Sequence, residues 1–177
     1  AGEYGGGLGY QNESTEMVGI RSTTFDGNTA GLDGGGIHFS GELMTILNGT
    51  FRNNTAENGG AIHNAEAALP HYIIRADTTM IINRSTIQDN TANTDGGGIF
   101  NDGTTGDITI TNSTIAGNTA TASGGGIASE GANVTLTSVT IAANTAVTGG
   151  GISSLAGIVS VINSLIASNN AGTGPDV

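Results

Sequence analysis

The chain has 177 residues, a formal net charge of −11 and no cysteine. An acidic surface of this kind repels nucleic acid and anionic lipid, so neither is expected as a partner, and the lack of cysteine excludes a disulfide framework and a cysteine-ligated metal. Aromatic residues make up 4% of the chain and glycines number 31, so the core has to be filled by Ile, Val, Leu, Ala and Thr, which suit a narrow β structure. No apolar run approaches the roughly 20 residues of a membrane-spanning helix.

A glycine-rich tetrapeptide that ends in Ile or Leu recurs along the whole chain. Its copies begin at Gly5, Gly34, Gly59, Gly96, Gly124 and Gly149. Each later copy follows an asparagine at a distance of eight or nine residues, counted to the closing isoleucine. The recurring asparagines are Asn28, Asn54, Asn90, Asn118, Asn144 and Asn169. Repetition at this spacing is typical of a solenoid, in which one structural unit stacks on the next.

Hydrophobic residues precede each asparagine at fixed distances. Ile108 and Ile110, for example, stand ten and eight residues before Asn118, with Thr109 between them. This period of two is typical of a β-strand with one buried face. A third hydrophobic residue stands three positions before each asparagine: Phe25, Phe51, Ile87, Ile115, Ile141 and Ile166. The tetrapeptide predicts a further short strand, with glycines allowing a sharp corner.

The shortest repeat, from Ile37 to Ile62, is 25 residues long. This length fits three short strands and three turns, so the sequence predicts an all-β fold, a single-stranded right-handed parallel β-helix with five to six rungs. One domain is expected over residues 1–177. The asparagines are expected inside it as a structural ladder, because Asn bonds the backbone of turns and its amide can stack from rung to rung. A helical fold is not expected, because glycine runs oppose it.

The repeats resemble those of chlamydial polymorphic membrane proteins, whose signatures are Gly-Gly-Ala-Ile and Phe-x-x-Asn. Residues 59–62, 25–28 and 51–54 match these signatures directly. In later repeats Ile replaces the Phe, and Gly replaces the Ala of the tetrapeptide. Similar repeats occur in large bacterial surface proteins. The resemblance implies a secreted or cell-surface β-helix, often the passenger of an adhesin, although the sequence shows no membrane-barrel segment.

The chain length between each isoleucine and the next asparagine varies, which places insertions at one corner of the coil. The largest insertion lies within residues 63–78 and adds about eleven residues to the shortest spacing. It contains large side chains that form a candidate binding loop: His63, Pro70, His71, Tyr72 and Arg75. Loops on a rigid scaffold often carry binding. The alternative is a tolerated surface insertion, since loops accept added length at small cost.

Two columns of side chains raise a metal hypothesis. His38 and His63 each follow the tetrapeptide isoleucine on successive rungs, but no third ligand stands in their column, so stacked surface histidines are expected. The position before the glycines carries a weak column of oxygen ligands that could hold Ca²⁺, Asp33, Asn58 and Asp95, but the column continues with Ser123 and Thr148. The nonapeptide of calcium-binding β-rolls is missing. The sequence therefore predicts no metal and no cofactor.

No catalytic residue is predicted. Parallel β-helices include polysaccharide lyases and hydrolases, which need a carboxylate pair or a base with cationic support. The chain has only 4 basic residues, and no Asp, Glu and Arg cluster converges on one face of the rungs. Ice binding would need a regular Thr-x-Thr ladder, and only residues 109–111 and 135–137 supply it.

Sequons for N-glycosylation are present at six asparagines. These candidate sites are Asn12, Asn48, Asn53, Asn83, Asn112 and Asn133. About four would arise by chance in a chain of this composition, so they gain meaning only in an organism that glycosylates asparagine.

Neither end shows a polar cap of the kind that blunts the open edges of repeat proteins. The chain is therefore expected to be a slice of a longer solenoid or a subunit that stacks head to tail into a filament. The favoured function is an extracellular or cell-surface structural β-solenoid, adhesin-like or filament-forming, with a surface glycan or receptor as partner. The alternative is a carbohydrate-binding or polysaccharide-cleaving β-helix that uses the 63–78 corner.

Overall fold

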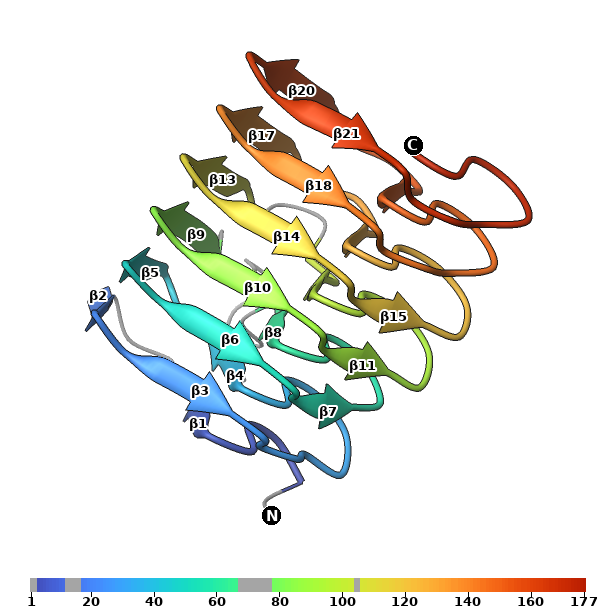
Figure 1. Ribbon diagram of the computed structural model, residues 1–177. Helices are drawn as coiled ribbons and strands as arrows, with labels where there is room; N and C mark the ends of the chain where they lie inside the picture. Colours follow the sequence, from blue (N-terminus) through green and yellow to red (C-terminus); the bar gives the residue numbers. More distant parts are fainter. Residues whose placement is uncertain (1–2, 12–16, 67–77, 104–105) are drawn as a thin grey trace.

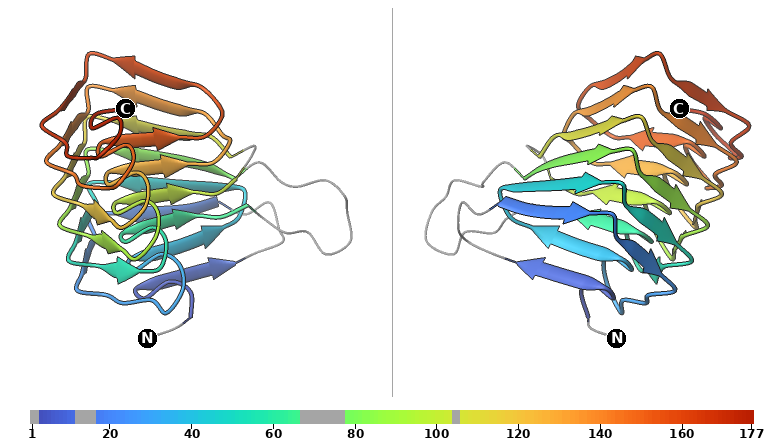
Figure 2. Two further views of the ribbon diagram at one scale, coloured as in Figure 1. Left: turned by 90° about the vertical axis from the view of Figure 1, so that its right-hand side faces the viewer. Right: turned by 60° about the vertical axis from the view of Figure 1, so that its left-hand side comes forward.

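The computed structural model describes residues 3–11, 17–66, 78–103 and 106–177. In these residues the chain winds in successive coils, and the strands of each coil pair in parallel with those of the coils before and after it (Figures 1 and 2). No helix occurs in these ranges. The predicted all-β solenoid is confirmed.

Three six-stranded parallel sheets form the long sides of the coil. Sheet A contains β1 (Leu8–Gln11), β4 (Ile37–Ser40), β8 (Ile62–Asn64), β12 (Ile99–Asn101), β16 (Ile127–Ser129) and β19 (Ile152–Ser154). Sheet B contains β2 (Met17–Arg21), β5 (Leu43–Leu47), β9 (Thr79–Asn83), β13 (Ile108–Thr111), β17 (Val134–Thr137) and β20 (Val159–Ile162). Sheet C contains β3 (Thr24–Asp26), β6 (Thr50–Arg52), β10 (Thr86–Gln88), β14 (Thr114–Ala116), β18 (Thr140–Ala142) and β21 (Leu165–Ala167).

A fourth, three-stranded sheet was not predicted. Sheet D contains β7 (Thr55–Ala56), β11 (Thr91–Ala92) and β15 (Thr119–Ala120). These Thr-Ala pairs each follow a ladder asparagine and pair with their equivalents on the next coil, and isolated bridges continue the sheet at Thr29 and Thr145. The coil therefore has three long sides and one short one, rather than three sides alone.

The strand register places equivalent repeat positions directly above one another. Ile62 pairs with Ile37 on one side and Ile99 on the other in sheet A. In the same way Ile110 stands between Ile82 and Leu136 in sheet B. A register slip of one residue would turn each buried file outward, so the hydrophobic pattern specifies this pairing.

The core is built from the hydrophobic files that the sequence pattern predicts. In one central coil these are Ile99 of β12, Ile108 and Ile110 of β13, and Ile115 of β14, all with an exposed fraction of 0%. The side chains of successive coils join into one continuous cluster along the axis. Aliphatic side chains of similar shape suit this narrow interior because they pack at close density without polar atoms.

The coil turns at corners where a residue adopts the left-handed conformation. One corner, between sheets B and C, uses Ser22, Asn48, Arg84, Asn112, Ser138 and Asn163. A second, just before the ladder asparagine, uses Gly27, Asn53, Asp89, Gly117, Ala143 and Ser168. The third is always the first glycine of the tetrapeptide. At Gly96, for example, φ is +66° and a Cβ would lie 2.7 Å from the carbonyl carbon of Ile99, so only glycine fits.

The remaining corner joins sheet A to sheet B, and its length varies most. It runs from Asn64 to Thr79 after β8, but only from Ser40 to Leu43 after β4. The predicted insertion therefore belongs to the corner between β8 and β9. Its residues 67–77 lie outside the described ranges.

Candidate functional site

The six repeated asparagines form a ladder inside the corner between sheets C and D. Asn118 donates from its backbone N and its Nδ2 to Oδ1 of Asn144, at 2.9 Å in both cases. Its Nδ2 also donates to the carbonyl oxygen of Ile87 at 3.0 Å, and its Oδ1 accepts from Asn90. The same pattern links Asn28 through to Asn169, whose amide donates to Asp176 at 3.0 Å. These amides hold coils together, as predicted, and their hydrogen-bonding atoms are used within the fold.

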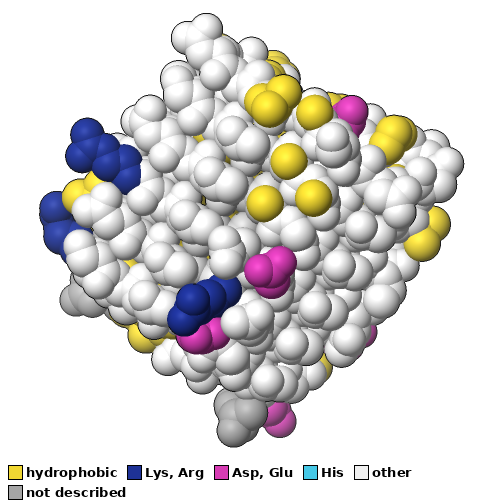
Figure 3. Space-filling model, viewed as in Figure 1, with side chains coloured by type: hydrophobic (Ala, Val, Ile, Leu, Met, Phe, Trp, Pro, Cys, Tyr) yellow, Lys and Arg dark blue, Asp and Glu magenta, His cyan; other side chains and the backbone are white. Residues whose placement is uncertain are grey.

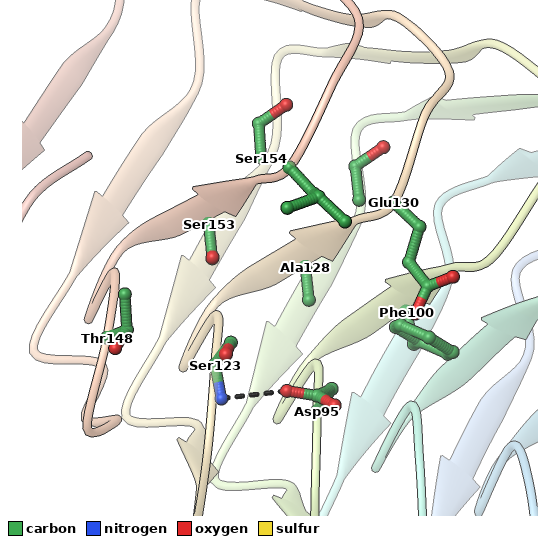
Figure 4. A pocket seen from close by; sticks show the side chains of 10 residues that line it. Asp95, Phe100, Ser123, Ala128, Glu130, Thr148, Ser153 and Ser154 are labelled. Carbon is green, nitrogen blue, oxygen red and sulfur yellow. Dashed lines mark hydrogen bonds between the residues drawn. The ribbon is translucent and has the colours of Figure 1, made fainter. Parts of the chain in front are cut away.

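The outer face of sheet A is hollowed over its later strands. In the later coils a groove of about 360 Å³ lies over β12, β16 and β19. Figure 4 shows Phe100, Ala128 and Ser153 along its floor, with Asp95, Ser123 and Thr148 on one wall. The other wall carries Glu130, Ser154 and Leu155. This groove crosses several coils, so it suits an extended ligand rather than a compact one.

Asp95, Ser123 and Thr148, the later members of the oxygen-bearing column that was weighed as a Ca²⁺ site, form one wall of this groove, and the column is hydrogen-bonded from Asp33 to Ser123. Asn58 Nδ2 donates to Asp33 Oδ1 at 2.9 Å, and the backbone N of Ser123 donates to Asp95 Oδ1 at 2.8 Å. The side chains of Asp33, Asn58 and Asp95 thereby each accept a hydrogen bond from the following coil. The column is a second ladder, and one carboxylate oxygen of each Asp is occupied by it.

His38 of β4 and His63 of β8 lie at the other end of the same face, in register with Phe100. The expectation of surface histidines is wrong, because each is only 3% exposed. The ring of His38 contacts Tyr4 at a centroid distance of 4.9 Å, and that of His63 stacks on Phe100 at 5.2 Å. The alternation of side chains along a strand places His38 and His63 on the outer face of sheet A. They are nevertheless buried, because the neighbouring rings and corner segments cover them.

Polar groups lie beside the nitrogen atoms of both rings. The Nδ1 atoms of His38 and His63 are 3.1 Å apart. Oδ2 of Asp33 lies 3.7 Å from His63 Nδ1, and Oδ2 of Asp102 lies 3.1 Å from His63 Nε2. The side-chain nitrogen of Gln11 lies 3.3 Å from His38 Nε2. Asp33 therefore supplies the third ligand type that the histidine column alone lacks.

Burial dominates the electrostatics of this cluster. It lowers the pKa of His38 to about 4, with a further contribution from the neighbouring His63 and against the opposing charges of Asp33 and Asp102. His38 is therefore neutral at pH 7. Burial by itself would raise the pKa of Asp102, but the hydrogen bond and charge of His63 and the backbone N–H of Glu66 lower it on balance.

The candidate binding loop is only partly described. His63 belongs to β8 and lies in the buried cluster just outlined, not on an exposed loop. Pro70, His71, Tyr72 and Arg75 lie outside the described residues. The candidate binding loop therefore remains a prediction, and His63 no longer belongs to it.

Of the sequons, Asn48, Asn53, Asn112 and Asn133 are exposed and Asn83 is partly buried. Asn53 donates from Nδ2 to Asp26, and Asn133 donates from Nδ2 to Asp107. A glycan on either nitrogen would have to replace such a hydrogen bond. Asn12 lies outside the described residues.

Two features of this face were missed by sequence reasoning. Asn64 donates from Nδ2 to Oδ1 of Asn101 at 2.8 Å, and both are fully buried, so they form a short second amide ladder. The sequence did contain a signal for this ladder, because both asparagines stand two residues after the isoleucine that closes the tetrapeptide. Asp102 had no such signal, because it lies after β12 in the variable corner and reaches His63 only through the stacking of coils.

Taken together, the coils, ladders and loops define a β-solenoid repeat protein. The family model of the Chlamydia polymorphic membrane protein repeat matches residues 22–40, 48–65 and 84–102. Each match spans a sheet C strand, the ladder asparagine and the glycine-rich tetrapeptide, ending at or just beyond a sheet A strand. The resemblance predicted from the motifs is confirmed. No curated protein and no solved structure matches the chain.

Among the described residues, none forms a helix with the length and apolar character that crossing a membrane requires.

Proposed function

We propose that this chain is a non-catalytic, structural part of a bacterial cell-surface protein, where it acts as a stiff adhesin-like spacer. The observation that supports this most directly is the match of three segments to a repeat of Chlamydia polymorphic membrane proteins, the name of which places that family at a membrane. A surface location outside the cell also suits a chain with no cysteine to be oxidised and with a strongly acidic surface.

The physical form of the chain supports the same proposal. Hydrogen bonds connect every pair of neighbouring coils along three sheets, and the asparagine ladder adds a further file of bonds. Such a rod resists bending and holds its corner loops at fixed spacing. The face over sheets C and D shows mostly uncharged polar side chains and backbone, with few and scattered charged groups (Figure 3). The chain would thus present its corner loops to a partner, while the faces of its sheets take no part in binding.

Protease treatment of intact cells of the source organism tests the location. We expect the protein to be cut or released while a cytosolic marker survives, and protection of the protein until the cells are lysed would contradict the proposal. Adhesion is tested by coating beads with the chain and counting beads bound to host cells. Beads coated with the same chain lacking residues 67–77 are the matched control, because they retain the solenoid and lose the corner loop.

A second function is favoured by the groove over β12, β16 and β19. Asp95 and Glu130 lie on opposite sides of its floor, and the serines Ser123, Ser153 and Ser154 also line it (Figure 4). We propose that an extended carbohydrate chain binds there, with cleavage as the further alternative. The site differs from the 63–78 corner, although both belong to the side of the coil that carries sheet A.

Glycan-array binding of the wild-type chain and of a Ser153→Arg variant tests this second function. Ser153 is partly exposed on the groove floor, so an arginine there would fill the groove without disturbing the core. Equal binding by both proteins, or no binding by either, would exclude the groove as a carbohydrate site. Release of sugars that is lost in Glu130→Gln would instead indicate cleavage.

A further inference from the structure

Two buried histidines point the same ring atom at each other beside a carboxylate. His38 Nδ1 and His63 Nδ1 are 3.1 Å apart, and Asp33 Oδ2 is 3.7 Å from His63 Nδ1. One ligand atom from each of the three residues lies within 4.8 Å of the other two. The fold brings them together from two successive coils, since β4 and β8 pair in parallel with His38 opposite His63. This cluster plays no part in either function proposed above.

Two of the three separations between these atoms are close to those between ligands around one metal ion, and the third is within 4.8 Å. Two donors held about 2.0–2.1 Å from a tetrahedral Zn²⁺ lie roughly 3.3–3.4 Å from each other. The Nδ1–Nδ1 separation of 3.1 Å and the Nδ1–Oδ2 separation of 3.7 Å fall on either side of that value. Rotations of the side chains by a small angle would equalise them, without movement of the paired strands.

The outer nitrogen of each ring has its own polar partner, which leaves Nδ1 as the ligand atom. His63 Nε2 is buried and lies 3.1 Å from Asp102 Oδ2, close enough for an ion pair, although the two atoms do not have hydrogen-bond geometry. Carboxylate–histidine–metal chains of this kind orient the ring and strengthen its second nitrogen as a ligand. Gln11 lies beside His38 Nε2 at 3.3 Å, and an amide turned end for end presents its oxygen to an N–H at that atom.

We propose that Asp33, His38 and His63 bind one Zn²⁺ ion, with Asp102 and Gln11 positioning the two imidazole rings. The proposal departs from the sequence-based expectation of no metal, which rested on the lack of a third ligand within the histidine column. Neutral imidazole is the form that binds metal. The Asp33 side chain, 18% exposed, gives the ion its entry side, while that of His63 is 4% exposed. Bound there, Zn²⁺ would link the second coil to the third.

The competing explanation is a hydrogen-bonded chain that needs no ion. In that arrangement Gln11 donates to His38 Nε2, His38 Nδ1–H donates to His63 Nδ1, and His63 Nε2–H donates to Asp102. Both explanations use the same residues. They differ in one measurable property, the binding of a single equivalent of metal, so the experiment has to measure metal directly.

Zn²⁺ titration of the full chain by calorimetry, after dialysis against a chelator, tests the proposal. We expect one Zn²⁺ per chain and a higher Tm with Zn²⁺. In the Co²⁺-loaded protein, visible absorption bands should report nitrogen ligands in a four-coordinate site. His63→Phe removes one ligand but keeps a ring like that of Phe100 on the next coil, and it should weaken binding by more than the roughly 10–100-fold that losing a supporting group costs.

A matched pair of carboxylate variants makes the test sharper. Asp33→Asn keeps the Oδ1 atom that accepts from Asn58 but loses the anionic ligand, and it should weaken Zn²⁺ binding at least about tenfold. Asp95→Asn changes the equivalent residue two coils later, next to Phe100 instead of a histidine, and should bind Zn²⁺ as the wild type does. If His63→Phe does not fold, this pair still decides the question.

Three results would overturn the proposal. The first is a folded wild-type chain that binds no Zn²⁺, which would leave the hydrogen-bonded chain as the explanation. The second is equal binding by Asp33→Asn and Asp95→Asn. The third is binding that survives His63→Phe and is lost in His71→Ala, which would place the ion on the one remaining histidine of the chain.

Discussion

Single residues in this solenoid stabilise it as members of stacked columns, because each residue makes the same contacts as the equivalent residues on the coils before and after it. Asn118 shows this most clearly. Its side chain bonds Asn90 on one coil, Asn144 on the next and the carbonyl oxygen of Ile87. A buried amide of this kind is costly to remove, because its partners lose hydrogen bonds that water cannot replace.

Asn118→Ala should therefore lower the free energy of unfolding by roughly 2–4 kcal/mol, since several buried polar atoms lose a partner at once. Asn93→Ala, an exposed position nearby in the chain, should change it by less than about 0.5 kcal/mol. Urea unfolding followed by circular dichroism measures both. Similar midpoints for the two variants would show that the ladder does not stabilise the fold.

The glycines divide into two kinds at the residue scale. A Cβ on Gly97 would lie 2.6 Å from the carbonyl oxygen of Thr119, with the backbone of Gly125 also in contact, whereas a Cβ on Gly27 would meet nothing within 4 Å. Gly27 has a φ of +67°, but Ala143 occupies the same corner position with a φ of +56°. At Gly97 any side chain would collide with the backbone of neighbouring coils. At Gly27 there is room for a side chain, and glycine is favoured only because φ is positive.

Gly27→Ala should accordingly cost about 1–2 kcal/mol, the usual penalty of an L-residue in the left-handed region. Gly97→Ala should cost more than this, because two strands of neighbouring coils would have to separate. Thermal unfolding of the two variants, compared at equal concentration, gives the order. A Gly97→Ala protein at least as stable as Gly27→Ala would contradict the close backbone approach seen at the tetrapeptide.

At the scale of elements, sequence periodicity predicts the strands whose side chains alternate and misses those too short to show a period. Sheets A, B and C follow from the hydrophobic files, and the Asn ladder follows from its constant phase. The two-residue strands of sheet D, such as Thr91–Ala92, carry no periodic signal. The burial of His38 and His63 was also invisible, because strand alternation describes the sheet and not the corner segments that cover it.

The coils differ in how well their strands are covered, although their sequences are alike. Leu136 of β17 is fully buried, while Val161, its partner in β20, is 44% exposed. Leu136→Ala should cost about 2–5 kcal/mol and Val161→Ala less than about 1 kcal/mol. Hydrogen exchange should likewise be faster in β20 and β21 than in β13 and β14, because stability in repeat folds rises with the number of neighbours. Uniform protection along the rod would contradict this gradient.

The whole molecule has an open edge at its last described coil. Strands β20 and β21 each stand at the end of their sheet, and Val161, Ile162 and Leu165 are 44%, 48% and 57% exposed, whereas residues 173–176 accept hydrogen bonds from residues 149–152 beside β19. Such an edge recruits a further strand, which could come from the same chain or from another copy. The net charge of −11 acts against association between copies, because like-charged rods repel each other at low ionic strength.

We expect a protein of residues 1–177 to self-associate end to end, and to do so more strongly as salt is added, since screening reduces the repulsion while apolar contact persists. Analytical ultracentrifugation over a range of concentration and salt measures this. Leu165→Lys places a charge on the open coil and should shift the protein toward monomer, whereas Asn93→Lys adds the same charge on an exposed turn within the rod and should not. A monomer at every concentration and salt would exclude head-to-tail stacking of this chain. Association that both variants retain equally would place the contact elsewhere on the surface.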